Sequence, residues 1–225
     1  MKTIKLTLLC IATIVCSLSL AAQNPIENAP LYGKTLNIIG DSYVRNHLKP
    51  YTETWHYKIA QKYNMTYNNY GINGNCIAYD RTHHGFGIPM YERYTQMADG
   101  ADYVIVMGGH NDAGLLNEMG GIEVFKEKLA VLCEGLINKY PGAKIAFISS
   151  WNVPREGFPE MLAALKEVCG EFSIPVYDAA TQSGIHVRNE NFRKKYFQSP
   201  NDTAHLNEEG HNLFMNRIET FLLGL

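Results

Sequence analysis

The sequence predicts an α/β protein: a three-layer α/β/α sandwich built on a five-stranded parallel sheet. From residue 35 to the C-terminus, segments of strand length alternate with amphipathic segments of helix length, the pattern of a parallel sheet with helices on both faces. The segment "ADYVIVMGG" (101–109) is apolar without alternation, as expected of a strand that is covered on both faces. No internal repeat or interdomain linker divides residues 23–225, so we expect a single domain there.

Apolar runs bounded by turn residues define the predicted strands. These strands are 35–40, 66–71, 101–109, 144–150 and 174–179. The second, "TYNNYG", is the weakest because its character alternates. Apolar residues at helical spacing predict helices over 53–64, 121–140, 158–172 and 207–225. Pro141 and Gly142 end the second of these helices, and Asn207 is a suitable N-cap for the last.

The connections between these elements predict the strand order. Right-handed crossovers favour a doubly wound sheet in the flavodoxin-like order 2-1-3-4-5, with strand one between strands two and three. The segments 75–100 and 179–206 are long and irregular. Long irregular segments in a compact domain often carry function, so we expect parts of the site there.

The first 22 residues have the layout of a secretory signal peptide. Lys2 and Lys5 precede an apolar stretch over 6–20, and small residues follow at Ala21 and Ala22. We expect cleavage near Ala22 and an exported protein, periplasmic or secreted. The apolar stretch is too short for a membrane span, so no stable membrane insertion is expected after the signal is removed.

Composition narrows the class of partner. Charged residues make up 19% of the chain and its formal charge is −2 at pH 7, so there is no basic excess to neutralise nucleic-acid phosphates. A flavodoxin-like cofactor protein is disfavoured, because a phosphate cradle needs several glycines and hydroxyls and "GDSYVRN" (40–46) offers one of each. We therefore expect neither a nucleic-acid partner nor a cofactor.

Cysteine and histidine positions favour neither a disulfide framework nor a metal site. Three cysteines follow the signal peptide: Cys76, Cys133 and Cys169. An odd count favours buried free thiols, although a bridge between Cys133 and Cys169 stays open in an oxidising compartment. The group Asp80, His83 and His84 fits no standard zinc spacing, so no metal is expected.

Polar residues that follow the predicted strands fit one chemistry. Ser42 comes directly after strand one, and a serine hydroxyl needs a base to become a nucleophile. "DTAH" (202–205) supplies His205 as that base and Asp202 to orient it; if this stretch forms a helical turn, the spacing of three puts both side chains on one side. Ser42 could also be only a helix N-cap. With the other segments, we interpret it as the nucleophile.

An acyl-transfer site also needs donors for the oxyanion. The backbone N–H groups of Ser42 and Gly74 and the side-chain amide of Asn111 are the candidates. In the order 2-1-3-4-5, Ser42 lies between the loop that carries Gly74 and the loop that carries Asn111. Asp112 is interpreted as part of the scaffold.

Four segments, in order, resemble the SGNH hydrolases, also called the GDSL esterase/lipase family. They are "GDS" (40–42), "NYGING" (69–74), "GHND" (109–112) and "DTAH" (202–205). The resemblance implies Ser42 as nucleophile, Gly74 and Asn111 as oxyanion donors, His205 as base and Asp202 as its orienting acid. Gly74 is preferred to Gly71 because "NYGING" aligns better that way. Tyr43 departs from the family pattern, which has Leu after the serine.

Three further residues are candidates for substrate binding: His110, Trp151 and Arg155. All follow predicted strands, where ligands bind in open parallel sheets. His110 is as well explained by loop packing. The fourteen tyrosines, several of them within 51–94, are consistent with stacking on sugar rings or with ordinary packing.

The resemblance implies a serine esterase that acts through an acyl-enzyme, and the signal-peptide layout implies that it is exported. Together with the absence of a large lipid-binding insertion, they indicate short-chain esters, with acetyl groups on carbohydrate as the expected substrate. A lysophospholipase or thioesterase of the same family is the alternative within this chemistry. A non-catalytic carbohydrate-binding protein on the same fold is the alternative from another class. The presence of Ser42, Asn111 and His205 favours the enzyme.

Overall fold

The computed structural model describes residues 26–225, so the predicted signal peptide and its cleavage site near Ala22 lie outside the described residues. The strands form one parallel sheet in the order β2-β1-β3-β4-β5, which confirms the predicted order. Their bounds are β1 Thr35–Gly40, β2 Thr66–Gly71, β3 Tyr103–Met107, β4 Lys144–Ile148 and β5 Val176–Tyr177. The first two strands begin and end where the sequence predicts.

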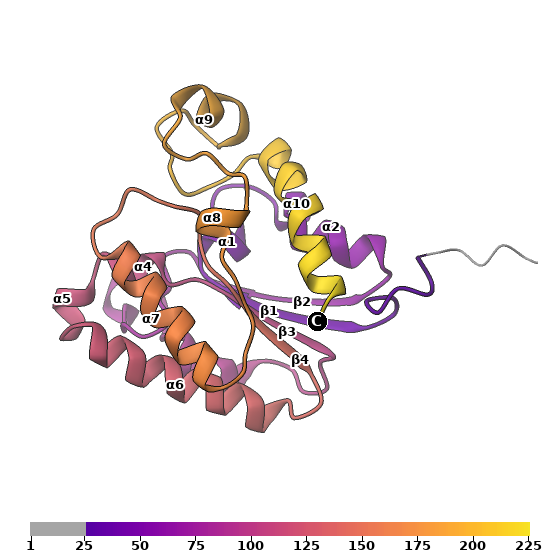
Figure 1. Cartoon of the computed structure of the whole chain (residues 1–225), viewed down its shortest axis with the longest axis horizontal. Coiled ribbons are helices and arrows are strands. Elements are labelled where there is room, and N and C mark those ends of the chain that lie inside the picture. The colour runs from indigo at the N-terminus through magenta and orange to yellow at the C-terminus, as the bar shows by residue number, and fades with distance from the viewer. Residues whose placement is uncertain (1–25) are drawn as a thin grey trace, which may run out of the picture.

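Helices cover both faces of this sheet (Figure 1). The long helices are α2 Trp55–Lys62, α6 Ile122–Lys139, α7 Phe158–Glu171 and α10 Glu208–Leu223. The shorter ones are α1 Ser42–Arg45, α3 Met90–Arg93, α4 His110–Ala113, α5 Leu116–Met119, α8 Ala179–Gln182 and α9 Glu190–Tyr196, with 3-10 turns at Tyr51–Glu53, Thr82–His84 and Tyr94–Gln96. Helices α6 and α7 pack together on one side, and α2 and α10 pack together on the other. The predicted three-layer sandwich is confirmed.

The central strand β3 is fully buried in the core of the fold. All five residues of β3 are buried, and apolar side chains from both helical layers cover them. Continuous burial of this kind is what an uninterrupted apolar segment requires.

Among residues 26–225, no helix is both long and apolar enough to cross a membrane.

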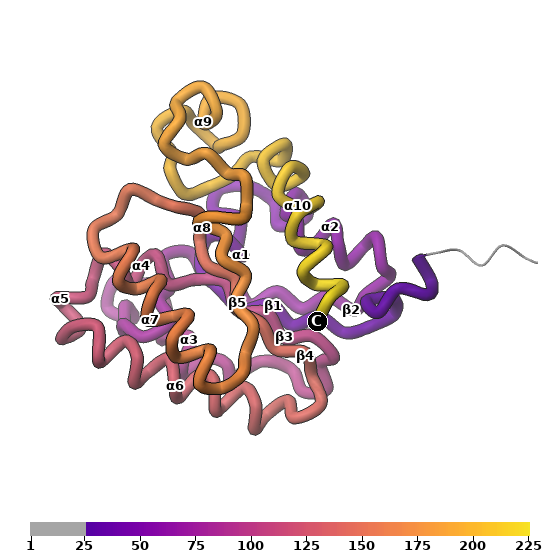
Figure 2. Tube along the Cα trace, viewed as in Figure 1, coloured from indigo at the N-terminus to yellow at the C-terminus, as the bar shows by residue number. Residues whose placement is uncertain are grey.

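The last strand is shorter than predicted. The sequence predicts 174–179, but only Val176 and Tyr177 pair with β4. The N–H of Ile174 turns back to close the end of α7, Pro175 has no N–H to donate, and Asp178 already caps α8. Figure 2 shows the trace running from β5 directly into α8.

The carboxyl ends of β1, β2 and β3 are level with one another. Gly40 at the end of β1 lies opposite Gly71 of β2 and Met107 of β3. The loops that follow these three strands therefore meet at one edge of the sheet.

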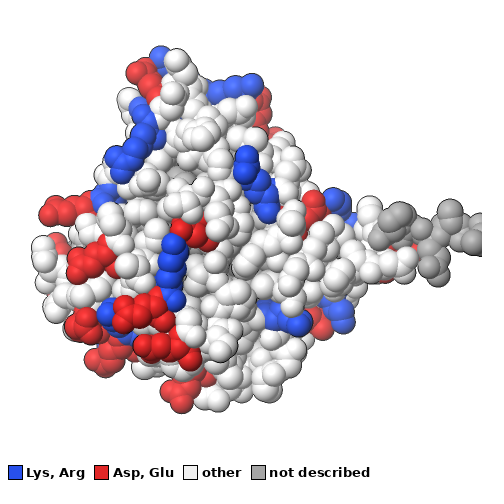
Figure 3. All heavy atoms as spheres, in the orientation of Figure 1, with Lys and Arg blue, Asp and Glu red and all other residues white. Residues whose placement is uncertain are grey.

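On the face seen in Figure 3, acidic side chains gather over α6 and α7, with Lys and Arg scattered among them.

Candidate active site

Ser42 is held at a sharp turn between β1 and α1. Asp41 is the N-cap of α1, and its Oδ1 accepts a hydrogen bond of 2.9 Å from the N–H of Tyr43. A Cβ on Gly40 would overlap the carbonyl oxygen of Met107 and the side chain of Val44, so only glycine permits this close turn. Because Ser42 is the first residue of α1, its own N–H has no partner within the helix.

The hydroxyl, imidazole and carboxylate predicted from the sequence lie in a hydrogen-bonded line. Ser42 Oγ is 2.9 Å from His205 Nε2, and His205 Nδ1 is 2.9 Å from Asp202 Oδ2. With Nδ1–H donating to the carboxylate, Nε2 is left to accept the serine proton. This is the arrangement of a nucleophile, a general base and a residue that orients the base.

Asp202 is fixed by more than the imidazole. Its second oxygen accepts hydrogen bonds from the N–H groups of Ala204 and His205. Burial alone would raise the pKa of Asp202, but the hydrogen bonds from the His205 side chain and from the two N–H groups outweigh it and lower the pKa. The carboxylate therefore stays charged beside the imidazole.

The segment that carries Asp202 and His205 is not the helical turn that the spacing suggested. Both residues lie in a non-helical turn before α10. The carboxylate of Asp202 closes this turn locally, and the N–H of Gln198 donates to the carbonyl of His205 at 2.9 Å. The two side chains still meet, because the turn itself folds the chain back.

Gly74 presents an N–H group that has no acceptor within the described part of the chain. Its φ of +70° favours glycine, and an added Cβ would overlap the ring of Phe86. The N–H of Gly71, by contrast, is engaged by Asn69 Oδ1 at 2.8 Å. Of the two glycines in "NYGING", Gly74 is therefore the one with a donor available for a ligand.

Asn111 lies in α4, directly after β3, and its side-chain amide is buried. The amide nitrogen donates to the carbonyl of Asn75 at 3.0 Å and, at a longer 3.3 Å, to Asp41 Oδ2. These contacts fix the amide between the β1 loop and the β2 loop. Ser42, Gly74 and Asn111 thus come from three adjacent loops at one edge of the sheet.

Asp112 ties two of these loops together, as expected of a scaffold residue. Its carboxylate accepts from the N–H groups of Ile77 and Ala78, at 2.9 and 2.8 Å. Burial raises the pKa of Asp112 to about 6, even though the backbone N–H groups oppose the shift. The carboxylate holds the loop after Gly74 against α4.

A buried arginine that the sequence did not single out braces the same loops. The Arg93 guanidinium donates to the carbonyl of Tyr70, the carbonyl of Gly40 and Asn75 Oδ1, at 2.6, 3.1 and 2.9 Å. Burial lowers its pKa to about 10, which still leaves it charged at neutral pH. Arg93 lies on α3, within the long irregular segment, where no local pattern signals burial.

The three predicted substrate-binding residues differ in their positions. Trp151 is only 1% exposed and packs against Tyr43 in the core, with ring centroids 4.4 Å apart, so it offers no surface to a substrate in this structure. His110 is also buried: Nδ1 lies 3.2 Å from Asp41 Oδ2, at an angle that makes no hydrogen bond. Arg155 is exposed and donates to the carbonyl of His110 at 3.2 Å, beside the Asn111 loop.

His47, which the sequence did not suggest, stacks on the imidazole of His205. The ring centroids are 4.2 Å apart and the planes differ by 15°. His47 and the preceding Asn46 both have positive φ, 38° and 66°. Asn46 is anchored by hydrogen bonds to the carbonyl of Pro50 and to His211 Nε2. Burial, and then the charge of His205, lower the pKa of His47.

The three cysteines within residues 26–225 are buried free thiols, with no bridge between Cys133 and Cys169. The hydrogen bond with Cys133, followed by burial, raises the pKa of Cys169. Asp80 accepts from the N–H and the hydroxyl of Thr82 in a local turn. Within residues 26–225, no group of three or more His, Cys, Asp or Glu side chains is arranged to hold a metal ion.

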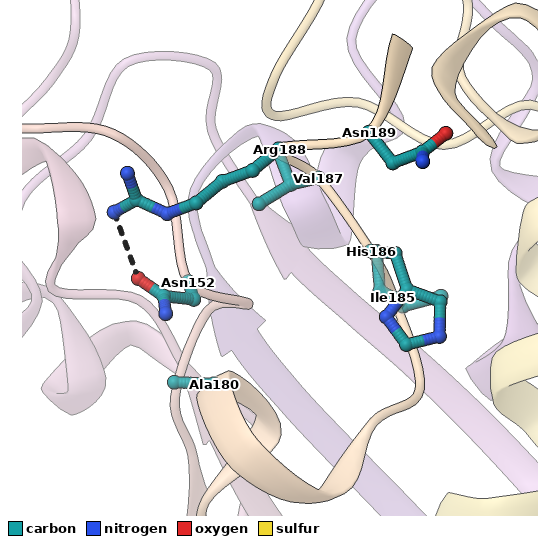
Figure 4. A pocket seen from close by; sticks show the side chains of 7 residues that line it. All are labelled: Asn152, Ala180, Ile185, His186, Val187, Arg188 and Asn189. Carbon is teal, nitrogen blue, oxygen red and sulfur yellow. Dashed lines mark hydrogen bonds between the residues drawn. The ribbon is translucent and has the colours of Figure 1, made fainter. Parts of the chain in front are cut away.

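Two pockets are relevant to ligand binding. One, of about 570 Å³, lies beside the loop after β4 and the segment 185–189, and none of Ser42, Asp202 and His205 lines it. In Figure 4, Arg188 extends across it to Asn152, where a 3.2 Å hydrogen bond holds the guanidinium. The other, of about 420 Å³, is lined by Arg45, Tyr51, Tyr67, Asn69 and Gly71.

Comparisons with known proteins agree with this fold. The model of the GDSL-like lipase/acylhydrolase family matches residues 38–213. A Lactobacillus plantarum protein is 22% identical, with a TM-score of 0.72, and the match covers 85% of this chain and 96% of that one. A protein from Bacteroides uniformis described as a GDSL-like lipase is 16% identical, with a TM-score of 0.59, over 85% and 96% of the two chains.

An acetyl xylan esterase is 14% identical, with a TM-score of 0.61, over 84% of this chain and 99% of its own. At these identities the structural likeness shows the fold, while the family model shows the family. No curated protein matches the chain. From the order of its sequence blocks, its fold and the family match over 38–213, the chain belongs to the GDSL-like lipase/acylhydrolase family, the SGNH hydrolases.

Proposed function

We propose that this chain is an exported serine esterase that removes short acyl groups, above all acetyl, from carbohydrate. The observation that carries the proposal is the line of hydrogen bonds from Ser42 Oγ to His205 Nε2 and from His205 Nδ1 to Asp202 Oδ2, each 2.9 Å long. A serine hydroxyl in this setting is ready to lose its proton to the imidazole as it attacks a carbonyl.

In the first half of the reaction, Ser42 Oγ attacks the ester carbonyl carbon while its proton moves to His205 Nε2. The imidazole is then positively charged, and the carboxylate of Asp202 stabilises it across the Nδ1–H bond. The tetrahedral intermediate collapses as His205 returns the proton to the leaving alcohol oxygen. An acyl-Ser42 ester and a free alcohol remain.

The oxyanion of the intermediate needs donors that are already in place. The free N–H groups of Ser42 and Gly74 serve without rearrangement. The Asn111 amide joins them by giving up its longer contact, the 3.3 Å bond to Asp41 Oδ2, and keeping its bond to the carbonyl of Asn75. The amide thus stays oriented while one N–H turns to the oxyanion.

In the second half, a water molecule replaces the alcohol. His205 takes a proton from the water, the hydroxide attacks the acyl carbonyl, and the same donors bind the second oxyanion. Collapse returns the proton to Ser42 Oγ and releases the carboxylic acid. The free enzyme is then restored with its hydrogen bonds as before.

The substrate class rests on two supports. The structurally similar acetyl xylan esterase acts on a carbohydrate ester, as its name states. The pocket that includes Arg45, on the helix of Ser42, is lined by polar and aromatic side chains, which suit a sugar better than a long acyl chain. The signal-peptide layout of residues 1–22 supports the export part of the proposal, because acetylated polysaccharides are met outside the cell.

The decisive experiment uses the protein without residues 1–22, the proposed signal peptide, on p-nitrophenyl esters of increasing chain length and on acetylated oligosaccharides. We expect the highest kcat/KM for acetyl esters and a steep fall with chain length. Ser42→Ala should abolish turnover with an unchanged far-UV circular dichroism spectrum. A preference for long acyl chains would support a lysophospholipase or thioesterase instead, and more than trace turnover by Ser42→Ala would reject the nucleophile.

A further inference from the structure

The pocket of about 420 Å³ beside α1 has a lining that the esterase chemistry does not use. Its walls come from three parts of the chain: Arg45 at the end of α1, Tyr51 in the following 3-10 turn, and Tyr67, Asn69 and Gly71 of β2. No carboxylate is among these five residues. The pocket therefore combines an aromatic wall, an amide and a cation.

Two walls of this pocket are formed by backbone that lies close in the chain or in the sheet to the nucleophile. Arg45 lies three residues after Ser42 on the four-residue helix α1, so about one helical turn separates their backbones. Gly71, at the other wall, lies opposite Gly40 in the parallel register, and Gly40 precedes Ser42 by two residues. A Cβ on Gly71 would overlap the backbone of Arg45, so glycine is what allows the two walls to approach closely.

The two tyrosines of the pocket lie nearly parallel to each other, and hydrogen bonds fix the hydroxyl of one of them. The rings of Tyr51 and Tyr67 lie within 22° of parallel, with centroids 6.1 Å apart, and Tyr57 meets each of them edge-on. The hydroxyl of Tyr67 is fixed by His56 Nδ1 and by the Asn69 amide, both at 2.7 Å. Tyr51 is 44% exposed, which leaves ring surface for a ligand.

The guanidinium of Arg45 is available for a ligand. Across residues 26–225 it makes no ion pair and no hydrogen bond, and its side chain is exposed. Lys58, by contrast, is already paired with Glu208 at 2.7 Å. A planar guanidinium beside an aromatic wall matches a carboxylate carried on a ring.

We propose that this pocket, the Arg45–Tyr51 pocket, is a binding subsite for an acidic sugar of the substrate, with a uronate ring against the tyrosines and its carboxylate on Arg45. The inference rests on the proposed esterase function and narrows its substrate to acetyl esters of acidic glycans. The subsite would hold a neighbouring sugar while the acetyl group on the next reaches Ser42.

Kinetics with paired substrates test the subsite. Acetylated oligogalacturonide carries the carboxylate, and acetylated xylo-oligosaccharide does not. We expect Arg45→Gln to raise the KM for the acidic ester about tenfold relative to that for the neutral ester, the effect of losing one charge-assisted hydrogen bond. Arg45→Lys should recover part of the loss, and higher ionic strength should raise only the KM for the acidic ester.

Lys49→Gln is the matched control, because Lys49 is an exposed cation on the same loop that does not line the pocket. It should leave both KM values as in the wild type. Tyr51→Leu should weaken binding of both oligosaccharides, because the stacking wall serves either ring. Equal ratios of the two KM values in Arg45→Gln and Lys49→Gln would overturn the proposal.

A binding measurement separates this proposal from the esterase function. The Ser42→Ala variant is titrated calorimetrically with unacetylated oligogalacturonide, and the titration is repeated with the double variant that carries Ser42→Ala and Arg45→Gln. Saturable binding that the second change abolishes supports the subsite, even if the wild type hydrolyses no ester and the esterase proposal fails. Ester hydrolysis with no effect of Arg45 on either readout leaves the esterase standing and removes the subsite.

Discussion

The imidazole rings of His47 and His205 lie face to face, 4.2 Å apart and within 15° of parallel. Two consecutive residues with positive φ, Asn46 and His47, bring the second ring there, and such backbone strain is often found at functional sites. The stack covers one face of the imidazole of His205, which becomes protonated in both halves of the proposed reaction. His47 is thus placed to act through His205 as a positioning residue.

His47→Ala should lower kcat about two- to fivefold, because the imidazolium of His205 loses an aromatic face worth about 0.5–1 kcal/mol. His47→Phe should restore the rate at neutral pH. Since the pKa of His47 is lowered, the ring is neutral at pH 7 and gains a proton only as the pH falls through that lowered value. At that lower pH the positive charge of His47 repels the positive charge that His205 gains during the reaction. The rate of His47→Phe relative to the wild type should therefore rise as the pH falls.

Steady-state rates of both variants between about pH 5 and 8, on p-nitrophenyl acetate, check this prediction. His84→Phe is the control, because His84 lies in the 3-10 turn Thr82–His84, away from the triad in sequence and exposed. If the ratio for His47→Phe stays flat across the range, the stack has no electrostatic role.

Asn111→Ala should lower kcat about 10²–10³-fold with little change in KM, the loss typical of one oxyanion donor. The substitution also removes the bond from the amide to the carbonyl of Asn75, so thermal stability must be followed in parallel. A rate equal to that of the wild type in a folded protein would remove Asn111 from the oxyanion site.

Gly74→Ala should cost stability and activity together. The φ of +70° costs an alanine about 1 kcal/mol, and its Cβ would displace the ring of Phe86, which costs about 1–3 kcal/mol more. Gly85→Ala is a matched control: its φ is +77°, but a Cβ there meets nothing within 4 Å.

Urea unfolding of the two variants isolates the overlap with Phe86. Adding Phe86→Ala to Gly74→Ala should restore part of the lost rate by making room for the Cβ. Equal destabilisation by Gly74→Ala and Gly85→Ala would show that Phe86 does not constrain the loop.

Asp112 should make stability fall as the pH rises from about 4 to 6. Its folded-state pKa of about 6 lies above the value of 3.8 for an unperturbed aspartate, so the folded protein holds a proton that the unfolded chain releases. The free energy of unfolding should drop by at most a value on the order of 3 kcal/mol over this range.

Asp112→Asn removes this titration, so the difference in unfolding free energy between variant and wild type should vary with pH between 4 and 7 and be constant above it. Denaturant unfolding at several pH values measures it. Glu118→Gln, on the exposed surface of α5, controls for general charge effects. A difference that does not vary with pH would mean that Asp112 has no raised pKa.

Much of the fold could be predicted from local pattern. The segments 35–40 and 66–71 become β1 and β2 with the predicted bounds. For β1 the reason is burial, because five of its six residues are buried, whereas no residue of β2 is fully buried and its pairing with β1 fixes it. The strand 174–179 was overestimated, since Pro175 and the cap at Asp178 limit pairing to two residues. Short helices such as α9 escaped prediction within the irregular segments.

The sequence by itself determined which chemical groups could form a site: a hydroxyl after the first strand, an acid three residues before a histidine, and an amide and glycines in the intervening loops. The order of the motifs and the alternation of strand and helix segments are properties of the chain, so Ser42, Gly74, Asn111 and the pair Asp202 and His205 could be named from it. The tertiary structure decided the 2.9 Å approach of Ser42 to His205, the burial of Trp151 and Arg93, and the stacking of His47. These features depend on packing between residues that are far apart in the chain, and a sequence pattern does not specify the distance between such residues.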